Sequence, residues 1–247
     1  MKILFLSDTH NQLACIQDLD LPDFDVICHS GDFTNRGEFI EVEAFTHRLL
    51  SMKAKNYVII PGNHELGFEK NKNEWRTYFA EKGITYLQDE EVIINGLKFY
   101  GVPWQRAFFD WEFNLPDGSD ELKSKFDNIP NDVDILLTHA PPYGILDQVS
   151  KHKKHLGERF LLNKLETLKN LKINAFGHIH ESGGIYRKNK KSPWFINASM
   201  MDSFQLPSPR RIYIAHIDED VKTHEEQLKN CWVESFDENN LEFYNSF

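Results

Sequence analysis

Five short apolar stretches of this sequence run directly into residues that can bind a metal ion. The stretches and their polar followers are ILFL (3–6) with Asp8 and His10, DVICHS (25–30) with Asp32, YVII (57–60) with Asn63 and His64, DILL (134–137) with His139, and INAF (173–176) with His178 and His180. Carboxylate, amide and imidazole groups bind divalent cations in proteins. Functional groups gather at the carboxyl ends of strands in open α/β sheets, so we expect these side chains to share one site.

The spacing of these residues suits metal binding. Residues two apart in an extended chain point to the same side, so Asp8 and His10 can face one ion together. The His-Ile-His segment 178–180 repeats this arrangement. Asn63 and His64 are adjacent and point apart, so one of them can bind metal while the other faces substrate.

The types of ligand restrict which metal ions the site could bind. The set contains no cysteine, which favours ions such as manganese, iron, zinc or nickel over a structural zinc cage. There are enough ligands for two ions, which lie about 3.5–4 Å apart in two-metal sites. Gly31, Gly62 and Gly177, which stand beside the ligands, permit tight turns and close backbone approach. Each polar residue alone could be a turn former or a satisfied polar group, but five such strand ends favour a metal site.

Composition limits the alternatives. The chain has 247 residues, 40% of them hydrophobic, which suits one large domain or two small ones with a sizeable core. Its formal net charge of -10 disfavours a protein that grips long nucleic acid. Three cysteines do not suggest a disulfide framework. The short apolar run at the N-terminus does not match a secretory signal, and we expect a cytoplasmic protein without a membrane partner.

The elements that must position these residues alternate between strands and helices. Strands are expected at 3–6, 25–29, 57–60, 91–94, 97–102, 134–138, 172–176, 184–187, 194–197 and 211–217, and helices near 12–19, 38–53, 72–82, 119–128 and 157–170. This alternation predicts α/β layers. Asn95-Gly96 between two apolar runs predicts a hairpin. The close spacing of the strands after residue 172 predicts an antiparallel meander.

The motifs DTH, GD, GNHE, TH and GHIH, in this order, resemble the calcineurin-like metallophosphoesterase superfamily. Longer stretches, such as GDFTNRGEFIEVEAF, HAPPYGILD and INASMMDSFQLPSPR, are similar to the small metallophosphoesterase-domain-containing subgroup, which includes cyclic nucleotide phosphodiesterases. The resemblance implies a four-layer αββα sandwich of two mixed sheets over residues 1–217. The acidic tail 218–247, which contains aromatic residues, has no assigned role.

The resemblance also implies roles for the site residues. Asp8, His10 and His180 would hold one metal ion, Asn63, His139 and His178 the other, and Asp32 would bridge both. His64 would contact the phosphate and assist the leaving oxygen. The implied activity is a dinuclear-metal-dependent phosphodiesterase for small phosphodiesters, cyclic nucleotides first, with in-line attack by a metal-bridging hydroxide. The alternatives are a phosphomonoesterase, a protein phosphatase or a nuclease of the same superfamily, or a non-catalytic binding protein on the same fold.

Several residues near the motifs keep two interpretations. Arg36 could grip substrate phosphate or pair with Glu38 or Glu41. Glu65 could support His64 or cap a turn. The aromatic residues of the stretch 103–113 could stack on a base, but a hydrophobic cluster under a loop is the more common arrangement; they are Trp104, Phe108, Phe109 and Trp111. The basic run 151–155 is interpreted as a solvated surface, and His29 as a packed strand residue.

Overall fold

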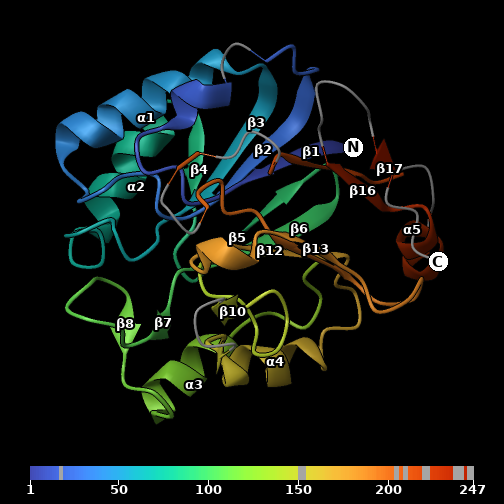
Figure 1. Cartoon of the computed structure of the whole chain (residues 1–247). Coiled ribbons are helices and arrows are strands. Elements are labelled where there is room, and N and C mark those ends of the chain that lie inside the picture. Colours follow the sequence, from blue (N-terminus) through green and yellow to red (C-terminus); the bar gives the residue numbers. More distant parts are fainter. Residues whose placement is uncertain are drawn as a thin grey trace.

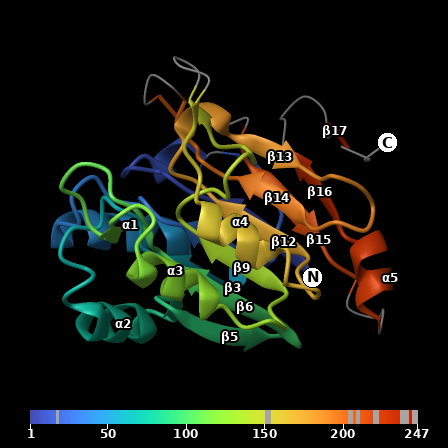
Figure 2. The ribbon, with the colours of Figure 1, turned by 90° about the horizontal axis from the view of Figure 1, so that it is seen from below.

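Two large β-sheets pack face to face, and helices cover their outer sides (Figures 1 and 2). The computed structural model describes residues 1–16, 19–149, 154–202, 206–207, 211–218, 223–235 and 242–243. Its layers run helix, sheet, sheet, helix, so the predicted four-layer αββα fold is confirmed.

The first sheet has seven strands. In spatial order they are β17 (Glu242–Phe243), β16 (Trp232–Ser235), β15 (Tyr213–His216), β1 (Lys2–Leu6), β2 (Phe24–Ser30), β3 (Ala54–Ile60) and β4 (Ile84–Tyr86). Strands β1 to β4 are parallel, whereas β15, β16 and β17 join in antiparallel fashion. The carboxyl ends of β1, β2 and β3 therefore lie side by side at one edge.

The second sheet has six strands. In spatial order they are β13 (Gly184–Tyr186), β14 (Trp194–Asn197), β12 (Ile173–Phe176), β9 (Ile135–Thr138), β6 (Leu97–Val102) and β5 (Glu90–Ile94). Strands β14, β12, β9 and β6 are parallel. The hairpin predicted at Asn95-Gly96 joins β5 to β6, and both turn residues have positive φ, 48° and 79°. Two short pairs, β7 (Gln105–Arg106) with β8 (Asn114–Leu115) and β10 (Gln148–Val149) with β11 (Lys154–His155), complete the strands described.

The structure describes seven helical segments, of which the longer ones cover the outer faces of the two sheets. They are η1 (Leu13–Ile16), α1 (Phe39–Ser51), α2 (Lys72–Glu81), α3 (Asp120–Asp127), α4 (Arg159–Leu165), η2 (His180–Ser182) and α5 (His224–Lys229). Helix α1 begins with a capping box formed by Glu38 and Glu41 and buries Val42, Phe45 and Leu49 at helical spacing. Across the described residues, every helix is too short or too polar to cross a lipid bilayer.

The central strands of both sheets, such as β1, β9, β12 and β14, bury both of their faces. Along β1, Ile3 and Phe5 contribute to the core between the two sheets, whereas Leu4 and Leu6 contribute to the core under the helices. Period-2 alternation places successive side chains on opposite faces, so a strand buried on both sides is apolar throughout. This burial explains why the strands stand out as apolar runs that end at the first polar residue.

The antiparallel meander predicted after residue 172 is wrong. Strand β14 pairs in parallel with β12, and β13 occupies the edge beyond it. Strand β15 leaves this sheet and pairs with β1 of the other one. Strand spacing along the chain does not reveal which sheet a strand joins, because the chain crosses between two stacked sheets. The described part of the tail adds β16 to the first sheet, and the boundary at residue 217 stays a prediction.

Candidate metal centre

The seven predicted metal ligands lie together at the edge where the two sheets meet. Six of them, together with His64, form three overlapping groups in which the ligand atoms lie within 4.8 Å of one another: Asp8 with His10 and His180, His10 with Asp32 and His64, and Asp32 with His139 and His178. The seventh, Asn63, lies beside His139. The first sheet contributes the ends of β1, β2 and β3, and the second sheet contributes the ends of β9 and β12. Asp32 connects the last two groups, and His10 connects the first two.

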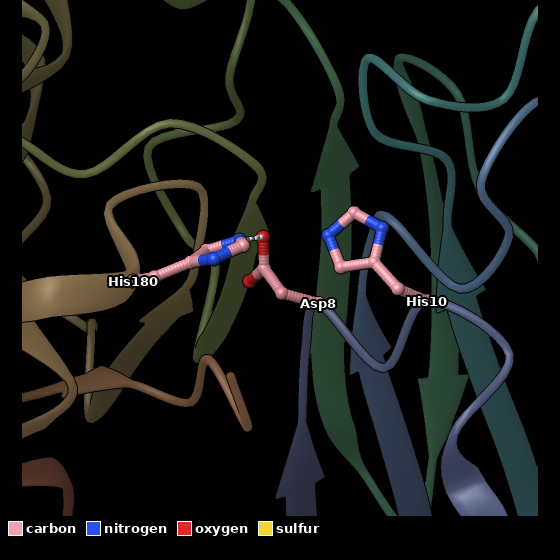
Figure 3. A group of neighbouring side chains, drawn as sticks. All are labelled: Asp8, His10 and His180. Atoms are coloured by element: carbon pink, nitrogen blue, oxygen red, sulfur yellow. Dashed lines mark ion pairs between the residues drawn. The ribbon is translucent and has the colours of Figure 1, made fainter. Parts of the chain in front are cut away.

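The first group consists of Asp8, His10 and His180 (Figure 3). The carboxylate of Asp8 faces the ring of His180, with 3.3 Å between Oδ1 and Nε2. The backbone N–H of His178 donates to both oxygens of Asp8, at 3.0 and 3.1 Å. Asp8 is fully buried, which alone would raise its pKa, but its hydrogen bond and charge interaction with His180 outweigh the burial, so its pKa lies well below the ordinary value.

The second group consists of Asp32, His139 and His178, with Asn63 beside them. Nε2 of His139 lies 2.9 Å from Oδ1 of Asn63 and 3.4 Å from Oδ1 of Asp32. Burial alone would lower the pKa of His139, but the charge of Asp32 outweighs it and raises this pKa to about 9. Two acceptor oxygens thus converge on one buried nitrogen, an arrangement that requires a cation, either a proton or a metal ion.

The side chains present fit metal ions. Nδ1 of His10 lies 3.2 Å from the carbonyl oxygen of Thr34, and Nδ1 of His139 lies 2.9 Å from that of Ser30. A carbonyl accepts only, so each Nδ1 carries a proton, and each ring in its neutral form presents the lone pair of Nε2. Metal-binding histidines are oriented in this way by their second nitrogen. Nε2 of His10 is buried without a hydrogen-bond partner, which suits a ligand atom.

Four of the predicted ligands have left-handed backbone conformations. The φ angles are 50° at Asp8, 40° at His10, 56° at Asp32 and 66° at His178. Such conformations cost a non-glycine residue about 1–3 kcal/mol and gather at functional sites. The strand-end turns therefore aim these side chains in directions that regular strands would not allow.

Close backbone approach at the site explains two of the glycines. A Cβ atom at Gly62 would lie 2.6 Å from the backbone nitrogen of Asp32 and 2.6 Å from Cε1 of His139. A Cβ atom at Gly177 would overlap the carboxylate of Asp8 and lie 2.8 Å from Cβ of Ser7. The ligands can approach one another only because these two positions carry no side chain.

His64 lies at the same edge but faces the open pocket. Its Nδ1 is 2.8 Å from the carbonyl oxygen of Asn35, so Nε2 is directed inward and lies 4.0 Å from Oδ2 of Asp32. Trp111 stacks on its ring at a centroid distance of 4.1 Å. The adjacent Asn63 is buried and points to His139, so the two neighbours do point apart as predicted.

A pocket of about 250 Å³ opens over the metal ligands. Its lining combines ligand residues, aromatic rings and two carboxylates: Asp32, Asn63, His64, Phe108, Trp111, His178, His180, Glu181 and Asp202. Of the four aromatic residues expected to form a hydrophobic cluster in the stretch 103–113, only Trp104 does so, and it is buried against Phe113. Phe108 and Trp111 instead line the pocket, and Phe109 is 80% exposed. The sequence left both arrangements open and favoured the cluster, because no local pattern shows where a loop docks.

Two residues with open interpretations, Glu65 and Arg36, belong to none of the three ligand groups. Glu65 contacts neither metal ligand side chains nor His64: its two oxygens accept from the backbone of Gly62, Asp32 and Thr34, so it ties two strand-end loops together. The side chain of Arg36 is exposed and outside the pocket lining, and its backbone N–H donates to Glu41.

Two predictions of a structural role can also be placed. His29 is buried, contacts Thr9 and packs on Phe33 and Phe45, as expected of a packed residue. In the basic run, residues 151–153 lie outside the described residues, and Nδ1 of His155 lies 2.6 Å from the buried Asp147.

Comparison with known proteins identifies the family. Residues 1–182 match the calcineurin-like phosphoesterase family. The chain belongs to the calcineurin-like phosphoesterases. The groups of histidine and aspartate described above could bind a metal ion.

Relatives within this family are found in animals. The human metallophosphoesterase domain-containing protein 1 is 36% identical over 220 residues, which cover 81% of this chain and 66% of the relative. A UPF0046 protein of Caenorhabditis elegans is 34% identical over 213 residues, which cover 81% of this chain and 69% of that protein. This chain thus spans slightly less than two thirds of the human relative.

Solved structures share the fold at low sequence identity. A protein of Thermus thermophilus is similar with a TM-score of 0.58 and 14% identity, covering 95% of this chain and 98% of that one. A dimetal phosphatase from Danio rerio has a TM-score of 0.55 and 10% identity, covering 87% of this chain and 92% of that one. At these identities the likeness concerns the fold of the phosphoesterase.

Proposed function

We propose that this phosphoesterase is a dinuclear-metal-dependent phosphodiesterase that hydrolyses small phosphodiesters, with cyclic nucleotides as first candidates. The position of Asp32 carries the proposal. Its Oδ2 lies 3.9 Å from Nε2 of His10 and its Oδ1 lies 3.4 Å from Nε2 of His139. One carboxylate thus offers one oxygen to each ligand group, as a residue that bridges two ions can.

In this proposal Asp8, His10 and His180 hold one ion, and Asn63, His139 and His178 hold the other. Divalent ions, manganese among the candidates, would neutralise phosphate charge and lower the pKa of water. Asn63 contributes an uncharged oxygen, which keeps the negative charge of the site low enough for an anionic substrate. These ligand roles extend the sequence prediction and agree with the grouping of the side chains.

The proposed role of His64 concerns the leaving group. Its Nδ1 donates to the carbonyl of Asn35, so Nε2 is the nitrogen that can give a proton to a departing oxygen. General acid catalysis of this kind contributes about 10²–10⁴-fold. His64 also belongs to a group with His10 and Asp32, so the ligand atoms alone would admit it as a metal ligand. Its partly exposed side chain and its place in the pocket lining favour contact with substrate.

The pocket lining supports a diester with a flat organic group. Phe108 is 48% exposed on the lining, and exposed aromatic rings beside a polar site favour a flat partner such as a nucleobase. Among the described lining residues there is no lysine or arginine, and Glu181 and Asp202 add negative charge. A phosphodiester carries one negative charge, whereas a monoester carries up to two, so this lining favours the diester. The acidic chain also disfavours long nucleic acid as substrate.

The cytoplasm is the location we propose, because Cys15, Cys28 and Cys231 are all free thiols. A phosphomonoesterase remains the second candidate within the same family. A phosphomonoesterase needs a cationic group to bind the dianionic phosphate of its substrate. Arg36, near the edge of the site, could provide this group, although it lies outside the pocket lining.

A substrate panel tests the proposed function. Protein reconstituted with Mn²⁺ would be assayed with cyclic nucleotides, linear diesters and monoesters, and kcat/KM compared. We expect diesters to exceed monoesters, and Phe108→Leu to reduce kcat/KM for nucleotide diesters more than for dimethyl phosphate, which has no ring to stack. Monoesters preferred over every diester would favour the phosphomonoesterase, and no hydrolysis of any ester would favour a binding protein.

A further inference from the structure

The side chain of Trp111 stacks on His64 at the mouth of the pocket. The two ring centroids are 4.1 Å apart and the ring planes are inclined by 29°. Trp111 is half-buried in the pocket lining, whereas its loop neighbour Phe109 is 80% exposed and outside that lining. Of these two aromatic residues of the loop, Trp111 is thus the one that contacts His64.

Three contacts together fix the imidazole of His64. The carbonyl of Asn35 accepts from Nδ1 at 2.8 Å, and Trp111 covers one ring face. The ring of His10 meets it edge to face, with centroids 4.6 Å apart. Only the contact with Trp111 comes from neither the strand-end loops of the ligands nor the backbone, so it can be removed without altering the metal ligands.

The loop that carries Trp111 is tied to the segment that carries His64. The N–H of Glu112 donates to the carbonyl of Asn63 at 3.2 Å. The N–H of Phe113 donates to the carboxylate of Glu69, and the N–H of Glu69 donates to that of Glu112, both at 3.2 Å. None of these bonds uses the indole. Replacement of the indole should therefore leave the loop in place and remove only the stacking contact with the imidazole of His64.

We propose that Trp111 is a positioning residue that holds His64 with Nε2 toward the leaving oxygen of the substrate. This inference rests on the proposed function, because Trp111 acts through the leaving-group role of His64. In the reaction, water forms the new bond to phosphorus and releases a proton to solvent. The bond from phosphorus to the leaving oxygen breaks, that oxygen takes the proton from Nε2 of His64, and His64 regains one from water.

The requirement for accurate placement sets the size of the effect. A misplacement of about 1 Å can cost about 10²-fold in rate. Without the indole, the ring of His64 keeps its bond to Asn35 but can tilt about it. Substrates with poor leaving groups need the proton most, so they should lose most. A good leaving group departs as an anion and should be little affected.

The experiment compares two diesters of one series, which leave as p-nitrophenolate and as phenolate. We expect Trp111→Leu to lower kcat about 10- to 100-fold for phenolate and less than about threefold for p-nitrophenolate, with metal content and KM unchanged. Trp111→Phe keeps a stacking ring and should recover most of the loss. The matched control is Trp232→Leu on β16, which removes an indole that likewise stacks on a histidine, His216, with ring centroids 4.6 Å apart, and which should leave both substrates unaffected.

A double-mutant cycle shows whether the effect passes through His64. In a His64→Ala background, Trp111→Leu should cause no further loss with the phenolate substrate, because coupled residues are not additive. Multiplied losses would overturn the proposal. Equal losses for both leaving groups in Trp111→Leu would also overturn it, since they would indicate damage to the metal site or the fold.

An NMR measurement gives a readout that does not depend on activity. The ring current of Trp111 should shift the carbon-bound protons of His64, and this shift should vanish in Trp111→Leu and remain in part in Trp111→Phe. If the shift is present and His64→Ala affects both leaving groups equally, the leaving-group role fails and the positioning role fails with it. If His64→Ala affects phenolate selectively and Trp111→Leu does not, only the positioning role is overturned.

Discussion

Replacement of Gly62 by alanine should disturb the metal centre more than the fold. The new Cβ would lie 2.6 Å from both the backbone nitrogen of Asp32 and Cε1 of His139. Real Cβ atoms essentially never approach other atoms within 3.0 Å, so each neighbour must retreat by about 0.4 Å or more. Overpacking of this kind costs about 1–3 kcal/mol. For a chain of this size, that corresponds to a fall in Tm of about 2–12 °C.

The effect of Gly62→Ala on catalysis should be larger, because the displaced residues are the bridging carboxylate and a ligand of the second ion. We expect kcat to fall about 10- to 100-fold, since displacement by about 1 Å can cost about 10²-fold. The assay combines bound-metal analysis, thermal melting and diester hydrolysis. The control is Gly184→Ala in β13, where the nearest atom to a new Cβ is 3.7 Å away. Wild-type metal content and turnover in Gly62→Ala would refute the close-approach reasoning.

Two further predictions concern substrate charge and pH. Arg36→Ala should raise KM for monoesters up to about fivefold, because an exposed contact is worth about 0–1 kcal/mol, and should change diester kinetics less; unchanged constants for both would remove Arg36 from substrate binding. In the metal-free protein, the pKa of His139 is raised from 6.5 to about 9, so its contribution to stability is full below pH 6.5 and is lost as the pH rises through about 9. The Tm of the metal-free protein should fall as the pH rises through about 9, whereas the Tm of the metal-loaded protein should not. The same dependence of Tm on pH in both forms would contradict the ligand role of His139.

More of the metal site than of the surrounding loops could be predicted from the sequence. Asp8, Asp32 and His178 follow apolar runs, and parallel pairing then brings the strand ends together. The left-handed φ angles at these residues could not be read from the sequence, because they are imposed by the tertiary contacts of the turns. Trp111 was missed as a partner of His64 for a related reason: its loop is placed by hydrogen bonds to residues more than forty positions away in the chain.

The topology after residue 172 shows the same limit. Local apolar runs located β12, β14 and β15, but they did not show that β14 pairs in parallel or that β15 crosses to the other sheet. The partner and direction of each strand depend on which sheet edge is unpaired when the two sheets pack together. The Asn95-Gly96 hairpin was predictable because its φ requirement is met by the two turn residues themselves.

Metal content measured together with activity tests the central claim of a two-metal phosphodiesterase most directly. Purified, reconstituted protein should hold close to two ions per chain, excess chelator should abolish diester hydrolysis, and added Mn²⁺ should restore it. Asp32→Ala should lose most of the bound metal, because Asp32 alone offers an oxygen to each ligand group. Full activity in excess chelator, or wild-type metal content in Asp32→Ala, would contradict the account.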